Sequence, residues 1–244
     1  MNHLLSLRIR KLGYSLLHPC CWNALRYGVA PSLEHRVVLA ELDYDLLIDV
    51  GANRGQFSLM SSFLHPDVPI HAFEPLESEA GTFRKIFAGK PHIELQNLAL
   101  GEREAQMTMH VSGRADSSSL LPIGKLQRQL YPATLEVGIQ SVKVVPLDSL
   151  SGGWAPVRRW LLKLDVQGFE LDVLLGAKAT LQRCTHVYAE CSHVTLYEGQ
   201  KLYPEVERFL HEHGFAPRRR LNEQWSNGQL IQADYLFTRN AAAA

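Results

Sequence analysis

The amino-acid sequence predicts a single α/β domain built on a mostly parallel β-sheet. Its length of 244 residues is enough for one such domain with a substantial hydrophobic core. From Asp45 onward, short apolar runs alternate with helical periods, which is the pattern of βαβ units. A glycine-containing turn joins the first of these runs to a helix. We therefore expect residues 45–240 to form the main domain and residues 1–44 a helical arm before it.

The elements of the first half follow from the spacing of apolar residues. Short apolar runs bounded by turn residues predict buried strands, and apolar residues three or four positions apart predict helices. The predicted order is a strand over 46–50, a helix with Phe57, Met60 and either Phe63 or Leu64 on one face, a strand over 70–73, a helix over 79–87, and a strand over 93–100 that ends at Gly101.

The second half contains an insertion and then returns to the core pattern. Met107–Val111 and Val142–Val145 alternate apolar and polar residues, which is typical of antiparallel strands with one exposed face. We expect these two stretches to form a small antiparallel insertion. The core resumes with a strand over 160–165, one helix carrying Leu171, Leu174, Leu175 and Leu181, a strand over 186–190, a helix that ends at Gly214, and a final pair of strands over 215–219 and 235–238.

The turn after the first strand predicts a cofactor site. Gly51 and Gly55 lack the Cβ that would hold a ligand away from the backbone, and the helix that follows offers free N–H groups. Pyrophosphate cofactors favour a G-x-G-x-x-G turn without a carboxylate just before it. Here Asp49 precedes Gly51, and its charge would repel a pyrophosphate but suits the ammonium and sulfonium groups of S-adenosylmethionine. The turn therefore favours S-adenosylmethionine over NAD.

A second acid, Glu74, ends the second strand about 20 residues beyond the last glycine of the turn. A carboxylate in this position accepts hydrogen bonds from both ribose hydroxyls of a nucleoside. We expect the cofactor to be bound by residues of the turn, of the second strand end and of two later segments: Asp49, Gly51, Ala52, Asn53, Gly55, Glu74, Pro75, Ala99, Leu100, Ser118 and Asp165.

The sequence from about Asp45 to Arg239 resembles the FkbM-like methyltransferases. The resemblance rests on separated segments in the same order: Asp49–Gly55, Phe73-Glu74-Pro75, Asp116–Leu120, Leu147-Asp148-Ser149, Lys163–Glu170 and Asp234–Phe237. It implies S-adenosylmethionine as cofactor and a Rossmann-like class I methyltransferase fold, in which seven mostly parallel strands include an antiparallel last strand. It also implies O-methylation of a hydroxyl on a sugar, glycan or natural product. Gln167 stands where many relatives carry Glu, which removes a charge beside the expected active site.

Three residues are candidates for the base that withdraws the proton of the accepting hydroxyl. Asp165 ends the fourth core strand and Glu190 ends the fifth, so both lie where ligands bind in parallel sheets. His193 follows the fifth strand, and an imidazole titrates near neutral pH. We expect these three to be catalytic. We predict no bound metal, because no compact set of oxygen ligands is visible.

Neighbouring polar residues have structural interpretations as well as functional ones. Lys163 shares a strand face with Asp165 and can serve as its counter-ion. Glu170 lies in the first turn of a helix, where the helix dipole stabilises a carboxylate. The serines at 117–119 form either a polar loop or a lid over the ligands, and Asp148 either caps a turn or has a functional role.

Composition limits the partners and the compartment. The 25 basic and 25 acidic residues cancel, which argues against a nucleic-acid partner. Cys20 and Cys21 are adjacent, and Cys184 and Cys191 flank one predicted strand, roughly 23 Å apart if extended, so we expect reduced thiols. With neither a membrane-spanning apolar run nor a cleavable leader in the sequence, we expect a cytoplasmic protein.

The arm over residues 1–44 is basic and amphipathic. It either packs on the domain over the mouth of the cofactor site or contacts a membrane surface or a partner. We keep both a monomer and a homodimer as hypotheses. Two other functions stay open at this point: an NAD-dependent oxidoreductase, which Asp49 disfavours, and a non-catalytic module that binds S-adenosylmethionine. Methylation of RNA or protein is disfavoured by the neutral charge balance.

Overall fold

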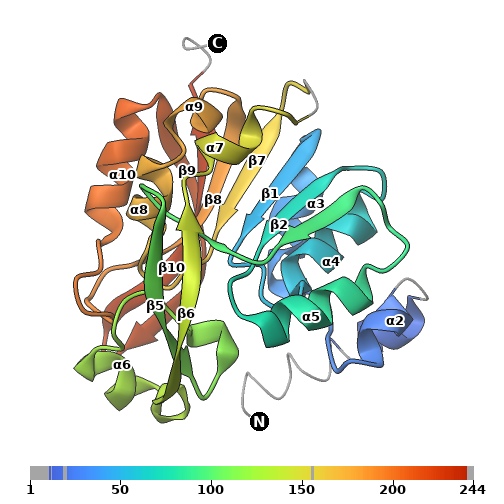
Figure 1. The fold of residues 1–244 in the computed structure, drawn as a ribbon. Coiled ribbons are helices and arrows are strands. Elements are labelled where there is room, and N and C mark those ends of the chain that lie inside the picture. The colour runs from blue at the N-terminus through green and yellow to red at the C-terminus, as the bar shows by residue number, and fades with distance from the viewer. Residues whose placement is uncertain (1–10, 12, 19–20, 155–156, 241–244) are drawn as a thin grey trace.

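The computed structural model describes residues 11, 13–18, 21–154 and 157–240. They form a seven-stranded sheet with helices on both faces and a three-stranded sheet at one end of it (Figure 1). In spatial order the large sheet contains β3 (Ile93–Gln96), β2 (Ile70–Phe73), β1 (Leu46–Val50), β7 (Trp160–Leu164), β8 (Cys184–Ser192), β10 (Gln229–Arg239) and β9 (Phe215–Ser226).

Strands β3, β2, β1, β7 and β8 pair in parallel, and β10 is antiparallel to both of its neighbours, β8 and β9. The predicted sheet of seven mostly parallel strands with an antiparallel last strand is therefore confirmed. The last two strands are longer than predicted, because β9 and β10 form a hairpin that extends well past the apolar segments visible in the sequence. Cys184 and Cys191 both lie in β8 as buried free thiols.

Successive side chains along a strand of the large sheet point to two different hydrophobic cores, one on each face of the sheet. Leu46, Ile48 and Val50 pack with α8 (Glu170–Leu175), α9 (Lys178–Leu181) and α10 (Tyr203–Glu212). Leu47 and Leu161 pack on the opposite face with α3 (Arg36–Glu41), α4 (Gln56–Leu64) and α5 (Glu77–Ile86). Asp49 and Lys163 belong to this second face by the same alternation, and so the only two charged side chains of β1 and β7 lie together.

The small sheet consists of β4 (Ala99–Leu100), β6 (Glu136–Val145) and β5 (Ala105–Ser112), in that spatial order. β5 and β6 are antiparallel, which confirms the predicted insertion. The single strand predicted over 93–100 is wrong, because its last two residues leave the large sheet and pair with β6 instead. The break falls at Asn97, whose side-chain amide donates to the carbonyl oxygens of Glu74 and Pro75.

The single helix predicted from Leu171 to Leu181 is also wrong, since α8 and α9 are separate helices. Gly176 lies between them, and a Cβ there would stand 2.0 Å from the carbonyl oxygen of Gly101. The close approach of this neighbouring segment accounts for glycine at the break. A short helix, α7 (Asp148–Ser151), packs beside α9, and Asp148 accepts hydrogen bonds from the backbone N–H groups of Ala179 and Thr180.

The described part of the N-terminal arm packs on the domain. α2 (Trp22–Leu25) precedes a 3₁₀ turn at Leu33–His35, and Val38 and Leu39 of α3 join the core that contains Leu47. The apolar and basic residues that the sequence places at positions 1–10 and 12 lie outside the described residues. Within the described part of the chain, no helix has the length and apolar character needed to cross a membrane.

Gly51 gives a direct test of how tightly the turn after β1 is packed. A Cβ at Gly51 would stand 1.9 Å from the carbonyl oxygen of Asp165, and Gly51 has a φ of +72°. Gly89 has a similar φ of +84° but open space around its Cβ position. We expect Gly89→Ala to lower the free energy of unfolding by about 1 kcal/mol and Gly51→Ala by about 3 kcal/mol or more. Urea unfolding of the two variants measures the difference, and equal losses would contradict this packing.

Candidate active site

The site lies at the carboxyl ends of β2, β1 and β7, which are adjacent in the sheet. The order of the strands reverses between β1 and β7, and ligands of open α/β sheets bind in the crevice formed at such a point. The turn after β1 carries Gly51 to Gly55, and the segment after β7 carries Asp165 to Gly168. These two segments form the floor of the site.

The turn after β1 is fixed to β2 by its backbone. The N–H groups of Gly51 and Ala52 donate to the carbonyl oxygen of Phe73 at 3.0 and 2.9 Å. Asn53 adopts a left-handed conformation with a φ of 49°, which is rare outside glycine and costs conformational energy. Gly55 begins α4, and a Cβ there would stand 2.6 Å from the ring of Phe87. Gly55 is therefore required by packing against α5.

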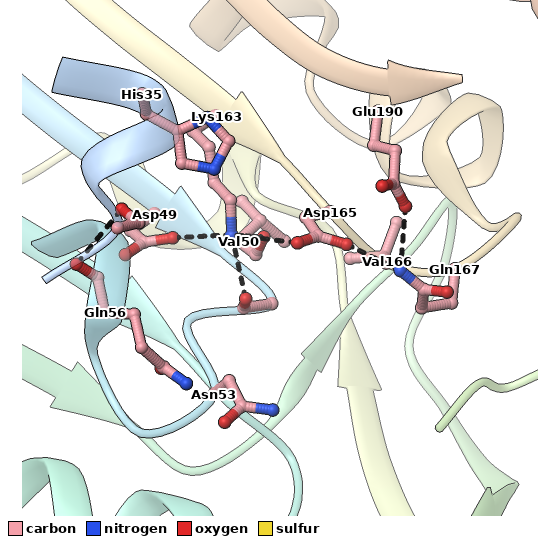
Figure 2. Close-up of polar contacts among 12 residues, drawn as sticks. His35, Asp49, Val50, Asn53, Gln56, Lys163, Asp165, Val166, Gln167 and Glu190 are labelled. Atoms are coloured by element: carbon pink, nitrogen blue, oxygen red, sulfur yellow. Dashed lines mark hydrogen bonds and ion pairs between the residues drawn. The ribbon is translucent and has the colours of Figure 1, made fainter. Parts of the chain in front are cut away.

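Asp49 lies at the start of this turn and faces Lys163 (Figure 2). It is fully buried, with one carboxylate oxygen 2.9 Å from Lys163 Nζ and the other accepting a 2.6 Å hydrogen bond from the Ser58 hydroxyl. Lys163 Nζ also donates to the carbonyl oxygen of Gly51 at 2.8 Å and lies 4.0 Å from the carboxylate of Asp165. The structure thus places Asp49 in a buried ion pair that supports the turn. It does not bring Asp49 and Glu74 into one cavity, as the sequence hypothesis required.

Glu74 is placed at the wall of the first cavity. Its two carboxylate oxygens accept hydrogen bonds from the backbone N–H groups of Asn53 and Leu76, both at 2.8 Å. Burial raises the pKa of Glu74 to about 7, and the two backbone hydrogen bonds oppose that rise. Each oxygen keeps a lone pair that can accept a further hydrogen bond from a ligand.

The first cavity has two kinds of wall. Gly51, Asn53 and Glu74 form a polar end. The remaining wall is mainly apolar and includes Leu98, Ala99, Leu100, Val166 and Phe169. A carboxylate beside an apolar slot matches a nucleoside, whose sugar diol donates hydrogen bonds and whose base is a flat, largely apolar ring. Pro75 and Ser118 also line this cavity, and the Ser118 hydroxyl accepts a hydrogen bond from the backbone N–H of Ser112.

Two larger cavities adjoin the first. The second, of about 290 Å³, is lined by Glu190 and Asp234 and by the 3₁₀ turn that carries His35. The third, of about 420 Å³, runs from Gly51, Ala52 and Asn53 to the arm. Asp165 and Asp116 line all three cavities, and Gln167 lines the first and the second. These three residues therefore mark the place where the cavities meet.

Gln167 joins the two acids predicted as catalytic (Figure 2). Its side-chain nitrogen donates to Asp165 at 2.7 Å and to Glu190 at 2.9 Å. Its own oxygen accepts a 2.8 Å hydrogen bond from the Tyr197 hydroxyl, which leaves the amide in one orientation. Gln167 has a left-handed φ of 54°, and strained backbone of this kind gathers at functional sites. Burial raises the pKa of both Asp165 and Glu190, and the charge of Asp165 raises the pKa of Glu190 further.

His193 lies apart from Asp165 and Glu190. Its ring stacks on Tyr203 of α10, with Nε2 2.6 Å from the Tyr235 hydroxyl, on the sheet face opposite Glu190. Burial lowers the pKa of His193, with a smaller contribution from the charge of Arg220. The structure brings Asp165 and Glu190 together and leaves His193 apart from them, because successive side chains of a strand point to opposite faces.

The structure also shows the contacts of Glu170 and of the serines at 117–119, for which the sequence allows either a structural or a functional role. Glu170 is buried and accepts hydrogen bonds from the backbone N–H groups of Val166 and Gly168, which shapes the segment after β7. Ser119 donates its hydroxyl hydrogen to the carbonyl oxygen of Gln167, so the serines at 117–119 pack against the segment that follows β7. In the part of the chain that the structure describes, no group of three His, Cys, Asp or Glu residues is arranged to hold a metal ion.

Sequence reasoning missed three polar residues of the site. Gln167 was noted only for its departure from the family pattern. Asp234 opens the last segment of the resemblance, and its carboxylate accepts hydrogen bonds from Tyr188 and Asn222. His35 comes from the arm, with Nδ1 3.0 Å from the Tyr188 hydroxyl and 3.5 Å from Asp234. No sequence signal links His35 to Asp234, which lies within β10 almost two hundred residues away.

The sheet order, the turn after β1 and the acid after β2 are those of an S-adenosylmethionine-dependent methyltransferase. Residues 49–217 match the family model described as "Methyltransferase FkbM domain". The chain belongs to the FkbM methyltransferase family.

Two curated relatives cover most of the chain. The 2-O-methyltransferase NoeI of Sinorhizobium fredii is 28% identical over an alignment of 174 positions, and the match covers 68% of this chain and 72% of the relative. The 31-O-demethyl-FK506 methyltransferase FkbM of Streptomyces tacrolimicus is 28% identical over an alignment of 202 positions, and the match covers 70% of this chain and 73% of the relative. A crystal structure of methyltransferase FkbM from Methylobacillus flagellatus aligns with a TM-score of 0.48 at 11% identity, covering 79% of this chain and 43% of that one.

Proposed function

We propose that the protein transfers a methyl group from S-adenosylmethionine to a hydroxyl of a small polar molecule such as a sugar, a glycan or a natural product. The observation that carries this proposal is that Asp165 lines both the first cavity and the second. A carboxylate between a nucleoside cavity and a polar cavity is placed to take the proton of a hydroxyl that faces the cofactor. Two relatives support the choice of oxygen, since their names describe O-methylation.

In this proposal the first cavity holds the nucleoside part of the cofactor. Glu74 accepts the ribose hydroxyls, Gly51 and Asn53 present the turn, and Ala99 and Leu100 lie in the apolar wall. The third cavity, which adjoins Gly51, Ala52 and Asn53, takes the amino-acid end. Bound S-adenosylmethionine supplies an electrophilic methyl group on a positively charged sulfur. Asp49 and Lys163 act by holding the turn in place.

Asp165 is the proposed base. Its side chain is half-buried, and this partial burial raises its pKa against the opposing charge of Lys163, which brings the carboxylate closer to the basicity that proton transfer near neutral pH requires. Gln167 holds Asp165 and Glu190 at fixed positions by donating one hydrogen bond to each. Glu190 stays available to bind a second hydroxyl of the acceptor or to share the proton. We do not assign His193 to this step, because it lies on the other face of the sheet.

Isotope transfer tests the proposal. The protein is incubated with methyl-labelled S-adenosylmethionine and a cell extract, and labelled products are identified by mass spectrometry. We expect a labelled small molecule or glycan in which the methyl group is bound to oxygen. Label found only in protein or nucleic acid, or only on nitrogen or carbon, would contradict the proposed acceptor class.

Glu74 gives the proposal a specific pH dependence. The ribose hydroxyls donate stronger hydrogen bonds to Glu74 when it is ionised than when it is protonated, and burial raises its pKa to about 7. We therefore expect the affinity for S-adenosylhomocysteine to fall as the pH drops through this value, by at most about tenfold per unit below it. Isothermal titration calorimetry across this range measures the effect. The dependence should vanish in Glu74→Gln, and a pH-independent affinity of the parent protein would contradict the role of Glu74.

The stability of the protein without cofactor should change in the opposite direction. Burial raises the pKa of Glu74 and of Glu170 from 4.5 to about 7. Between these two pKa values the folded state binds more protons than the unfolded state. The contribution of both groups to the free energy of unfolding is therefore present at low pH and is lost as the pH rises through this range. Saturating S-adenosylhomocysteine should weaken this fall, because it favours the ionised form of Glu74.

A further inference from the structure

The second cavity holds more carboxyl groups than proton transfer alone requires. Its lining includes one guanidinium, from Arg114, and five carboxyl groups, from Glu34, Asp116, Asp165, Glu190 and Asp234. Arg114 is bound in an ion pair with Asp116 at 2.7 Å, and Lys11 is bound by Glu34 at 2.7 Å. Lys163 lies nearer to Asp49 than to Asp165. Among the described residues, the only basic side chain within 4 Å of Asp234 or Glu190 is His35, at 3.5 Å from Asp234.

The side-chain amide donors beside Glu190 and Asp234 are already engaged. The side-chain nitrogen of Gln167 serves Asp165 and Glu190, and that of Gln232 donates to Glu190 at 2.8 Å. The side-chain nitrogen of Asn222 donates to Asp234 at 2.6 Å. Each carboxylate oxygen can accept more than one hydrogen bond, so the spare capacity of the lining is largely that of acceptors.

Gln127 of α6 (Lys125–Leu130) is an independent sign of a missing donor. It lines the second cavity, and its residue surface is only 4% exposed. Its side-chain nitrogen faces the Tyr197 hydroxyl at 3.5 Å, while its oxygen has no hydrogen-bond partner in the described part of the chain. The single proton of Tyr197 is directed to Gln167 or to the carbonyl oxygen of Ser117, so Gln127 cannot satisfy its oxygen by turning its amide over. A buried acceptor without a partner is costly, and a ligand donor would relieve that cost.

We infer that the acceptor molecule carries a protonated amino group in addition to the hydroxyl that is methylated, as an amino sugar or an amino alcohol does. An ammonium group offers three donors and a positive charge, which complement the unpaired acceptor of Gln127 and the excess of carboxyl groups in the lining. Glu190 and Asp234 are opposite each other on β8 and β10, and they form the negative wall that would hold it. This inference rests on the proposed function and narrows its substrate class.

Matched sugars test the inference. The protein is saturated with S-adenosylhomocysteine, and binding of glucosamine, glucose and N-acetylglucosamine is measured by isothermal titration calorimetry. We expect glucosamine to bind about tenfold more tightly than either neutral sugar. Glucose or N-acetylglucosamine binding as tightly as glucosamine would overturn the inference, as would failure of glucosamine to bind at all.

Variants of the acids that line the second cavity test where the amino group binds. Asp234→Asn and Glu190→Gln each replace a carboxyl group with a neutral amide of nearly the same shape, and both should reduce the preference for glucosamine severalfold. Glu212→Gln changes an exposed acid on α10 and should leave the preference unchanged. Normal affinity for S-adenosylhomocysteine shows in each case that the variant is folded. An unchanged preference in both cavity variants would contradict the assigned wall.

The charge of the labelled product provides a second test of the inference. The product of the isotope experiment should be retained on a cation-exchange resin and should react with an amine-acylating reagent. A labelled O-methyl product that is neutral or acidic would overturn the inference and leave the proposed function standing. The absence of any labelled small molecule would instead count against the proposed function itself.

Discussion

Replacing Asp165 with Asn is expected to lower the rate of methyl transfer by about 100- to 10 000-fold, which is the usual contribution of a positioned base. Asparagine retains an oxygen that can accept the hydrogen bond from Gln167, so the local structure should persist. Affinity for S-adenosylhomocysteine should change less than the rate, because Glu74 and the turn after β1 supply most of the proposed cofactor contacts. The rate is measured as label transfer from S-adenosylmethionine, and affinity by calorimetry.

Asp67→Asn is the matched control for this substitution. Asp67 is exposed between α4 and β2, and its replacement should leave both the rate and the affinity unchanged. A parallel loss of rate and cofactor affinity in Asp165→Asn would point to a binding role in place of a catalytic one. Full activity of Asp165→Asn in the cell would favour a non-catalytic module that binds the cofactor.

Replacing Glu74 with Ala is expected to weaken S-adenosylhomocysteine binding by about 100-fold or more, the value of two hydrogen bonds to a charged acceptor. The same change leaves the backbone N–H groups of Asn53 and Leu76 without their present partner. The free energy of unfolding should therefore also fall, by about 1–3 kcal/mol for each group that stays buried and unpaired. Calorimetry measures the first effect and urea unfolding the second.

Two comparisons separate binding from folding at this position. Glu74→Gln keeps one oxygen and should lose less stability than Glu74→Ala while still losing affinity. Glu77→Gln alters an exposed neighbour on α5 that pairs with Arg84, and it should change neither quantity appreciably. S-adenosylhomocysteine should raise the melting temperature of the parent protein and of Glu77→Gln by mass action. A similar rise in Glu74→Ala would show that the cofactor does not depend on Glu74.

The local elements of the core could be predicted because each depends on a short stretch of sequence. The strand Leu46–Val50 is uniformly apolar except for Asp49, and the structure gives it the predicted bounds. The strand Ile70–Phe73 and the helix end at Gly214 were likewise defined by apolar spacing and by a residue suited to a positive φ. The breaks at Asn97 and Gly176 escaped prediction, since each depends on contact with a distant segment.

In the candidate site, too, the features that depend on local sequence could be predicted, and those that depend on distant segments could not. The sequence placed Glu74, Asp165 and Glu190 at the carboxyl ends of strands, and in a parallel sheet these ends meet at one edge. It could not show that Asp49 turns away from the cavity toward Lys163, because side-chain direction depends on what fills the face below. Nor could it show that His193 points to the face covered by α10.

The sequence by itself determined the fold class, the glycine turn, the acid after the second strand and the family to which they belong. These follow from local spacing, from backbone conformations that glycine allows, and from chemistry carried within short motifs. Only the tertiary structure decided that Gln167 bridges two acids, that the arm brings His35 to Asp234, and that the second cavity is rich in unfilled acceptors. Such arrangements depend on where distant segments pack, and that packing is set by the whole core at once.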